Sequence, residues 1–427
     1  MPWAVDASGS YSANSLRRVE AMHSVPASSR REIFLVALKL GLTSFGGPVA
    51  HLGYFHDEYI RRRKWLSESS YADLVALCQF LPGPASSQLG FSIGLLRGGL
   101  LGGFLAWLGF TLPSAILMTL CGYGLAAIGD VSHAGWLKGL KLAAVAVVAQ
   151  AVWTMAVKLC PDRVRASLAI VSAVAAFALS KTLWGQIAIL SGGAIFGLAV
   201  LPKDQQDSTS SSVHSSLSIP GVTRRAAVAS LGLFFVLLFG LPVLRAASAN
   251  GTVAVFDSFY RSGALVFGGG HVVLPLLQAE TVVPGWVSND QFLAGYGLAQ
   301  AVPGPLFTFA AYLGSVMQPP QPTGWIGAAV CVAAIFLPTG LLVLGVLPFW
   351  EELRRREWAQ SLLRGANAAV VGLLLAALYQ PVWTSAVHNP SDFILALAAF
   401  GLLVFWKWPP WLVVGLAAAG GQLLLSG

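Results

Sequence analysis

The feature that most constrains this chain is a series of thirteen apolar segments, most of them close to the ~20 residues that cross a bilayer as a helix. They cover residues 33–55, 71–96, 99–127, 135–157, 166–180, 184–201, 226–244, 254–279, 292–316, 324–349, 361–380, 393–406 and 409–425. Charged residues make up only 10% of the chain, against roughly 25% in soluble proteins. The sequence therefore predicts an all-α polytopic membrane protein. The net charge of +8 does not indicate nucleic-acid binding, because the basic residues form short clusters between apolar segments.

Polar stretches divide the chain into four parts. Residues 1–32 lack the apolar core of a secretory signal, and we interpret them as a cytoplasmic tail. Residues 33–201 hold the first set of apolar segments. The Ser-rich linker at 202–225 should be flexible and cytoplasmic, and residues 226–427 hold one extra segment and the second set.

The second set repeats the first at an offset of 221 or 222 residues. Gly41-Leu-Thr-Ser-Phe45-Gly46-Gly47-Pro48 aligns with Gly263-Ala-Leu-Val-Phe267-Gly268-Gly269-Gly270, and Gln79-Phe-Leu-Pro82-Gly83-Pro84 aligns with Gln300-Ala-Val-Pro303-Gly304-Pro305. Pro113 and Pro338 follow in the same order. Chance does not maintain such an offset over about a hundred residues, so we interpret the chain as a tandem duplication.

Loop charges predict that the two copies have opposite orientations. Arg61-Arg-Arg-Lys64 follows the Phe-Gly-Gly motif of the first copy, whereas residues 280–290 contain no Lys or Arg. Later loops show the reverse, with no Lys or Arg at 128–134 and three arginines at 354–356. Because cytoplasmic loops are enriched in Lys and Arg, this pattern resembles the inverted repeats of secondary transporters.

Basic residues flank both ends of segments 33–55 and 71–96. A straight span would place one of these clusters outside the cell. We therefore expect these segments to be re-entrant or broken, with their copies, 254–279 and 292–316, entering from the opposite face. The alternative is two ordinary spans with one basic loop outside.

The Phe-Gly-Gly and Pro-Gly-Pro motifs predict a helix break inside each of these four segments, because proline removes a backbone donor and glycine permits positive φ. Broken backbone at membrane depth needs surrounding protein or a wet cavity, and its free N–H groups attract anions. Breaks from both faces would meet near the midplane, where inverted-repeat transporters bind substrate. The alternative is that these small residues only permit close helix crossings. The candidate substrate-binding residues at the breaks are Gly46, Gly47, Pro82, Gly83, Pro84, Gly268, Gly269, Gly270, Pro303, Gly304 and Pro305.

Two cations occupy matching repeat positions before the breaks. Lys39 and Arg261 each precede the Phe of Phe-Gly-Gly by six residues, and buried cations in membranes often mark an ion path. If they bind substrate, Lys39→Ala or Arg261→Ala abolishes transport in a protein that still inserts. Snorkelling toward headgroups, or an i,i+4 pair of Arg261 with Asp257, is the alternative.

Other polar side chains adjoin the breaks. Gln79 and Gln300 precede Pro-Gly-Pro, and Ser86, Ser87 and Thr308 follow it. These groups can donate to an oxyanion or cap a helix.

Four titratable residues are candidates for proton coupling: His51, His271, Glu58 and Glu280. Packing for the histidines, and a solvated position for the carboxylates, are the alternatives. The cysteines form no CxxC pair and have no metal-ligand spacing. We therefore expect no metal site and no cofactor.

At these motifs the chain resembles the chromate ion transporter family. The matching stretches are Phe45-Gly-Gly-Pro-Val-Ala-His-Leu-Gly-Tyr-Phe, Arg62-Arg-Lys-Trp-Leu, Gln79-Phe-Leu-Pro-Gly-Pro-Ala-Ser-Ser-Gln, Val266-Phe-Gly-Gly-Gly-His-Val-Val-Leu-Pro and Ala299-Gln-Ala-Val-Pro-Gly-Pro-Leu-Phe. The resemblance covers roughly residues 33–425 and is to a long, two-domain member. It implies chromate efflux through a bacterial inner membrane, with resistance to chromate, driven by the membrane potential or a proton gradient.

Several alternatives stay open. Sulfate has the same charge and shape as chromate, so a sulfate or other oxyanion transporter fits the same motifs, as does a passive channel. A membrane-embedded enzyme would need a catalytic or cofactor motif, and no HExxH, CxxC or Rossmann fingerprint occurs. The sequence does not fix the oligomeric state, for which a homodimer is one option.

Overall fold

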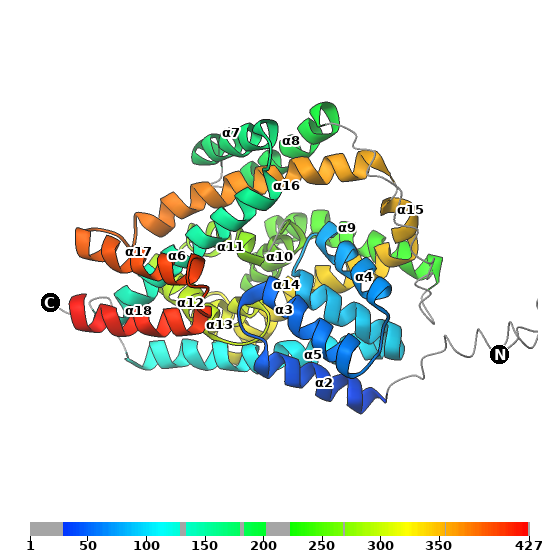
Figure 1. Ribbon diagram of the computed structural model, residues 1–427, viewed down its shortest axis with the longest axis horizontal. Helices are drawn as coiled ribbons and strands as arrows, with labels where there is room; N and C mark the ends of the chain where they lie inside the picture. Colours follow the sequence, from blue (N-terminus) through cyan, green and yellow to red (C-terminus); the bar gives the residue numbers. More distant parts are fainter. Residues whose placement is uncertain are drawn as a thin grey trace, which may run out of the picture.

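The computed structural model describes residues 29–128, 134–179, 183–201, 223–267, 270–354 and 356–425. The predicted cytoplasmic tail up to residue 28 and residues 202–222 of the predicted linker lie outside the described residues. Every element within these ranges is helical (Figure 1). The first half contains α2 (Arg30–Thr43), α3 (Gly47–Phe55), η1 (His56–Arg62), α4 (Glu68–Phe80), α5 (Ala85–Ile128), α6 (Gly135–Leu159), α7 (Arg163–Leu179) and α8 (Leu183–Val200). The second half contains α9 (Arg224–Ala247), α10 (Gly251–Ala264), η2 (Gly270–Val272), α11 (Val273–Thr281), α12 (Asn289–Ala301), η3 (Leu306–Thr308), α13 (Phe309–Val316), α14 (Gly324–Val346), η4 (Leu347–Phe349), α15 (Trp350–Arg354), α16 (Glu357–Ala377), η5 (Leu378–Trp383), α17 (Pro390–Val404) and α18 (Pro410–Leu425).

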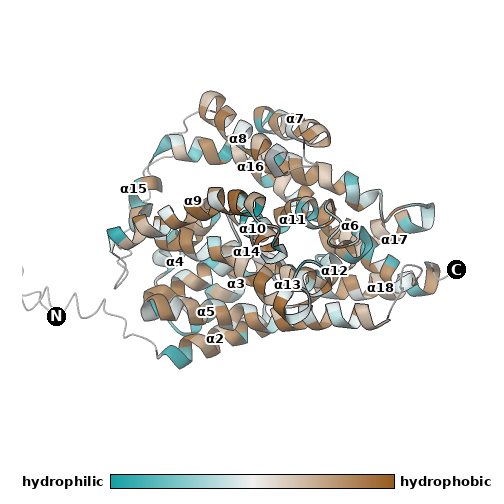
Figure 2. Cartoon of the chain, turned by 180° about the vertical axis from the view of Figure 1, so that it is seen from behind, coloured by the Kyte–Doolittle hydropathy of each residue, from teal (hydrophilic) through white to brown (hydrophobic). Residues whose placement is uncertain are grey.

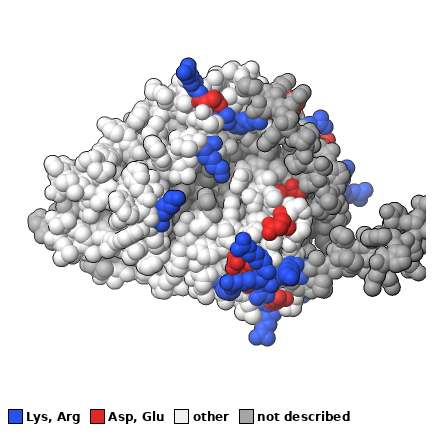
Figure 3. All heavy atoms as spheres, viewed as in Figure 1, with Lys and Arg blue, Asp and Glu red and all other residues white. Residues whose placement is uncertain are grey.

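The helices expose the kind of surface that lipid requires. Five of the described helices are long and apolar enough to cross a membrane: Ala85–Ala127, Gly135–Leu159, Arg224–Ala247, Gly324–Leu353 and Glu357–Trp383. Apolar residues cover most of the ribbon in Figure 2, and on α9 the side chains of Val236 and Phe239 are more than 60% exposed. Charged residues gather over the blue helices α2 to α4 on the face shown in Figure 3, and much of that face is uncharged.

All four predicted helix breaks are present. The interruptions fall between α2 and α3, α4 and α5, α10 and α11, and α12 and α13. One boundary differs from the prediction, because segments 71–96 and 99–127 are not separate helices. They meet within α5, which changes direction at Gly98 and Gly99, where the backbone leaves helical φ and ψ. The flexible glycine pair allows a kink where the sequence suggested an end.

Each broken segment of the first half returns to the level at which it began. Arg63, just after η1, forms an ion pair of 2.6 Å with Glu32 in the first turn of α2. The guanidinium of Arg97, at the α5 kink, lies 5.3 Å from the ring centroid of Trp65, just before α4. Both contacts join the start of a segment to its end, so both segments have the re-entrant course expected from the flanking basic clusters.

The broken segments of the second half follow the same course. Arg245, which precedes α10, lies 3.3 Å from a carboxylate oxygen of Glu280 near the end of α11. Trp286, which precedes α12, accepts a backbone hydrogen bond of 3.0 Å from Gln318, which follows α13. The second repeat thus reproduces the two re-entrant segments of the first.

The two pairs of re-entrant segments start near opposite ends of the part of α5 that follows its kink. Arg97 joins α5 to the start of the first-half segments, whereas the ring of Tyr123 lies 6.0 Å from that of Trp325, beyond the end of the second-half segments. At 1.5 Å per residue, the helix from the kink to Tyr123 is about 36 Å long. This length is close to the thickness of a bilayer core.

Outside this centre, the repeats exchange helices. Helix α6 of the first half packs against α17 and α18 of the second, and α16 of the second packs against α7 and α8 of the first. A Cβ on Gly135 would lie 2.5 Å from the carbonyl oxygen of Gly421, and one on Gly193 would lie 2.9 Å from that of Gly365. Small residues therefore permit backbone contact at both exchanged interfaces.

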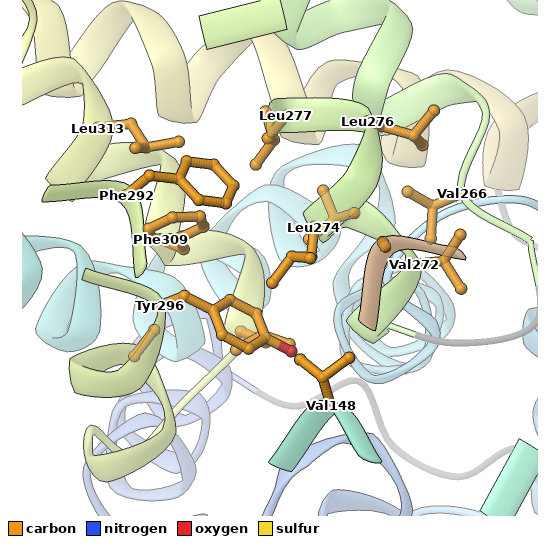
Figure 4. Close-up of a cluster of buried hydrophobic side chains, with 14 of the residues drawn as sticks. Val148, Val266, Val272, Leu274, Leu276, Leu277, Phe292, Tyr296, Phe309 and Leu313 are labelled. Atoms are coloured by element: carbon orange, nitrogen blue, oxygen red, sulfur yellow. The ribbon is translucent and has the colours of Figure 1, made fainter. Parts of the chain in front are cut away.

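A buried apolar cluster fixes the second-half segments. The ring of Phe309 on α13 lies 5.1 Å from that of Phe292 and 5.8 Å from that of Tyr296, both on α12. Leu274 and Leu277 of α11 lie beside these rings (Figure 4). The packing of α11, α12 and α13 therefore holds both second-half breaks in position.

Candidate functional site

The break sequences explain the local backbone. Gly46 and Gly47 have φ of +93° and +77°, and Pro48 follows within the first turn of α3. Gly83 and Gly304, the central residues of the two Pro-Gly-Pro motifs, have φ of +121° and +98°. Residues with a side chain rarely adopt these values. Glycine is therefore needed for the turns themselves.

The four breaks meet in two reciprocal crossings. The N–H of Gly304 donates to the carbonyl oxygen of Ser44 at 2.9 Å, and the N–H of Gly83 donates to that of Val266 at 2.7 Å. In each case the Pro-Gly-Pro break of one repeat binds the Phe-Gly-Gly break of the other. The two bonds are equivalent under the sequence repeat, and we name them the Ser44–Gly304 crossing and the Val266–Gly83 crossing.

These bonds change the expected role of the central glycines. The N–H groups of Gly83 and Gly304 were expected to face an anion, but in this conformation they are bound to carbonyl oxygens. These two N–H groups are therefore not available to an anion in this conformation. Gly268 and Gly269 lie outside the described residues.

Hydroxyl groups from the long helices close both crossings. A Cβ on Gly304 would lie 2.7 Å from Oγ of Ser114 on α5, and one on Gly83 would lie 3.4 Å from Oγ1 of Thr339 on α14. Ser114 and Thr339 follow the equivalent prolines Pro113 and Pro338. In each crossing, the Pro-Gly-Pro break of one repeat therefore packs against the long helix of the other repeat.

Lys39 lies in an ion-pair network with Glu58. Its Nζ is 2.7 Å from Oε2 of Glu58, whose other oxygen accepts from Nε of Arg63 at 2.9 Å. The Glu58 side chain is only 6% exposed, whereas that of Lys39 is 48% exposed. This network joins α2 to η1, the two arms of the first re-entrant segment.

Arg261 lies in an equivalent but more buried network. It forms two hydrogen bonds of 2.7 Å with Asp257, as its i,i+4 spacing allowed, and lies 3.3 Å from Glu280. Arg245 adds contacts of 3.3 Å to both carboxylates, and Ser258 donates to Glu280. Glu58 and Glu280 have the same offset as Lys39 and Arg261, a signal from which the sequence could have predicted both pairs.

The remaining predicted polar residues differ in their surroundings. Gln79 is exposed, whereas its equivalent Gln300 is buried and its Nε2 has no hydrogen-bond partner. Ser86 and Ser87 are buried after the first Pro-Gly-Pro. Thr308 after the second donates to the carbonyl of Pro305 at 2.8 Å, which is the capping alternative.

The two predicted histidines are also not equivalent. A ring nitrogen of His271 lies 2.8 Å from the hydroxyl of Tyr296. His51 is 1% exposed, and its ring lies edge-on to Phe110 with the centroids 5.5 Å apart. It lies close to the backbone of Ser44, but neither ring nitrogen has a well-formed hydrogen bond.

Comparison with known proteins gives one consistent result. Residues 31–198 and 253–422 each match the family model described as "Chromate transporter". The chain is 27% identical over 418 residues to a "Probable chromate transport protein" of Synechococcus elongatus, covering 95% of this chain and 98% of the relative. It is 31% identical over 406 residues to a "Chromate transport protein" of Pseudomonas aeruginosa, covering 92% of each chain. A "Chromate transport protein" of Cupriavidus metallidurans is 26% identical over 415 residues, 94% of each chain.

No solved structure matches this chain. The two family matches coincide with the two halves that contain the re-entrant segments.

Proposed function

We propose, from the premise that the chain belongs to the chromate transporter family, that it exports chromate across a bacterial inner membrane and so confers resistance to chromate. The observation that carries this proposal is the pair of reciprocal crossings, in which broken backbone from both repeats meets inside a helical bundle. Backbone of this kind occurs in membrane proteins around substrate pathways. We place the substrate at these crossings.

The membrane potential can drive this export. Moving one charge through 100 mV is worth about 2.3 kcal/mol. A dianion that leaves a negative interior gains roughly twice that free energy. Proton exchange through His51, His271, Glu58 or Glu280 is therefore an optional addition to the mechanism.

The proposed transport is tested with the purified protein in liposomes. Chromate flux is measured at clamped potentials, with sulfate as competitor and external chromate for exchange. We expect saturable chromate exchange, and net chromate efflux that increases when the chromate-containing side is negative. Flux proportional to concentration without saturation would indicate a channel, and saturable flux of sulfate in preference to chromate would identify another oxyanion as the substrate. Absence of any oxyanion flux would remove the proposal.

We further propose that the two repeats are inverted in the membrane, with the N-terminus in the cytoplasm. The contacts that α5 makes beside the two sets of re-entrant segments support this arrangement, since they lie at opposite ends of the part of α5 that follows its kink. A cysteine at Ser69, beside the first pair, is expected to react from the cytoplasmic side. A cysteine at Val283, beside the second pair, is expected to react from the periplasmic side.

The measurement is labelling by a membrane-impermeant maleimide in right-side-out and inside-out vesicles, after the four native cysteines have been replaced by serine. Ser69 is partly exposed, and Val283 is 59% exposed. Labelling of both cysteines from the same side would contradict the inversion. Transport by each variant serves as the control for folding.

A further inference from the structure

The Ser44–Gly304 crossing contains buried polar groups without partners. Ser44, His51 and Thr111 are 0%, 1% and 2% exposed. Oγ of Ser44 and Oγ1 of Thr111 have no hydrogen-bond partner, and neither ring nitrogen of His51 has a well-formed one. Leaving a buried polar group unpaired costs about 1–3 kcal/mol, so three such residues at one place need a physical reason.

A chain of contacts links the segments that carry these residues. Ser44 is joined to Gly304 through its carbonyl, and a Cβ on Gly304 would meet Oγ of Ser114. Ser114 donates to the carbonyl of Thr111, one turn earlier on α5. His51 contacts Phe110, the neighbour of Thr111, and lies close to the backbone of Ser44.

The equivalent crossing has apolar residues at these positions. The sequence repeat places Val266 opposite Ser44 and Val273 opposite His51, and the equivalence of Pro113 with Pro338 places Phe336 opposite Thr111. These three side chains are buried in the apolar core. Thr339 alone retains the hydroxyl of its counterpart, Ser114. The fold of the crossing therefore does not require the polar set, because the second repeat forms the same turn without it.

The polar set consists of neutral groups that can each donate a hydrogen bond. The cations of the two re-entrant segments, Lys39 and Arg261, are engaged by carboxylates. Neutral donors can hold an oxyanion whose oxygens accept several hydrogen bonds at once, and such charge-assisted bonds are stronger than neutral ones. A site of this kind releases its anion more readily than a site with a buried cation, which suits a transporter.

We propose that Ser44, His51 and Thr111 bind the transported tetrahedral oxyanion through neutral hydrogen bonds, at one crossing only. This inference rests on the proposed transport function and narrows it to one of two equivalent positions. It assigns Ser44 and Thr111 as specificity-determining residues for a ligand with oxygen acceptors in several directions. The Val266–Gly83 crossing then serves to hold the second repeat in register.

The test compares Ser44→Ala, Thr111→Val and His51→Leu with the intact protein in liposomes. We expect each variant to raise KM for chromate about tenfold, the effect of one lost hydrogen bond to a charged ligand. His51→Gln keeps an N–H donor and is expected to lie closer to the original KM. Sulfate should also inhibit chromate transport less strongly in each of these three variants, because it would lose the same hydrogen bond.

Two further variants test whether the effect is specific to the assigned residues. Thr119→Val is the matched control, because Thr119 is equally buried on the same helix and donates to its own helix at Ala115. It should leave KM unchanged, so an equal rise there would show a general effect of hydroxyl loss on α5 and overturn the assignment. Thr339→Val should change KM less than Thr111→Val, and a larger change would place the anion at the other crossing.

Failure of this inference is distinct from failure of the proposed function. If the intact protein exchanges chromate and the Ser44, His51 and Thr111 variants keep its KM, the transport function stands and the assigned site is wrong. If the intact protein moves no oxyanion, the function itself is wrong. Thermal unfolding of each variant in detergent identifies a loss of flux caused by misfolding, and retention of the original melting temperature with a raised KM supports the site.

Discussion

Replacing Arg261 by leucine is expected to lower the stability of the folded protein by about 3–5 kcal/mol and to abolish transport, because it removes the main partner of two buried carboxylates. Asp257 is 0% exposed and the Glu280 side chain 9%, and Arg261 contacts both. Arg245 would remain as a partner, but it contacts each carboxylate at 3.3 Å. The measurement is the unfolding midpoint in detergent together with chromate flux in liposomes.

Lys39→Leu is the matched variant in the first repeat. Its side chain is 48% exposed, and Glu58 keeps Arg63 as a partner. An exposed charge contributes little to stability, so we expect a loss of no more than about 1 kcal/mol. Equal destabilisation by the two substitutions would contradict the difference in burial on which the prediction depends.

A charge exchange separates an ion-pair role from a substrate role for Lys39. In the doubly substituted protein Lys39→Glu with Glu58→Lys, the pair between α2 and η1 can form again with reversed signs. Recovery of transport relative to Lys39→Glu alone would show that Lys39 acts by joining the two arms of its segment. Continued loss of transport in a stable protein would support direct contact with the anion.

The sequence predicted those parts of the fold that depend on glycine and proline at helix breaks. Glycine and proline restrict the backbone wherever they occur, so the breaks at Gly46 and Gly83 could be located within a few residues. The repeat transferred the same prediction to Gly304. Basic residues at both ends of a segment indicated the re-entrant course. The Glu32–Arg63 contact agrees with it, because it joins the start of the first segment to its end.

The sequence could not predict contacts that depend on how the repeats dock. The bond between Gly304 and Ser44 joins residues from different repeats, and no local pattern encodes it. The exchange of α6 and α16 between the halves is of the same kind. The partner of Lys39 was missed because a separation of 19 residues has no helical periodicity. It becomes predictable only when Glu58 and Glu280 are compared through the repeat.

Replacing Gly304 by alanine is expected to reduce chromate transport by at least tenfold. Its φ of +98° is strained for any residue with a side chain, and the new Cβ would lie 2.7 Å from Oγ of Ser114. The backbone must shift to relieve both effects, at a cost of about 1–3 kcal/mol, and the hydrogen bond to Ser44 would weaken. Because this bond aligns the two repeats at their crossing, a small displacement should affect the substrate path more than the global fold.

Gly285→Ala distinguishes the effect of backbone strain alone from the effect of strain at the crossing. Gly285 has a φ of +78°, but a Cβ there would meet nothing within 4 Å, so this variant carries backbone strain in a loop away from the crossings. We expect a similar loss of stability with little loss of transport. In Gly304→Ala the additional replacement Ser114→Ala removes the atom nearest the new Cβ, and it should restore part of the flux. If Gly285→Ala impairs transport as strongly as Gly304→Ala, the defect arises from strained glycine in general, and alignment of the repeats at the Ser44–Gly304 crossing is not what transport requires.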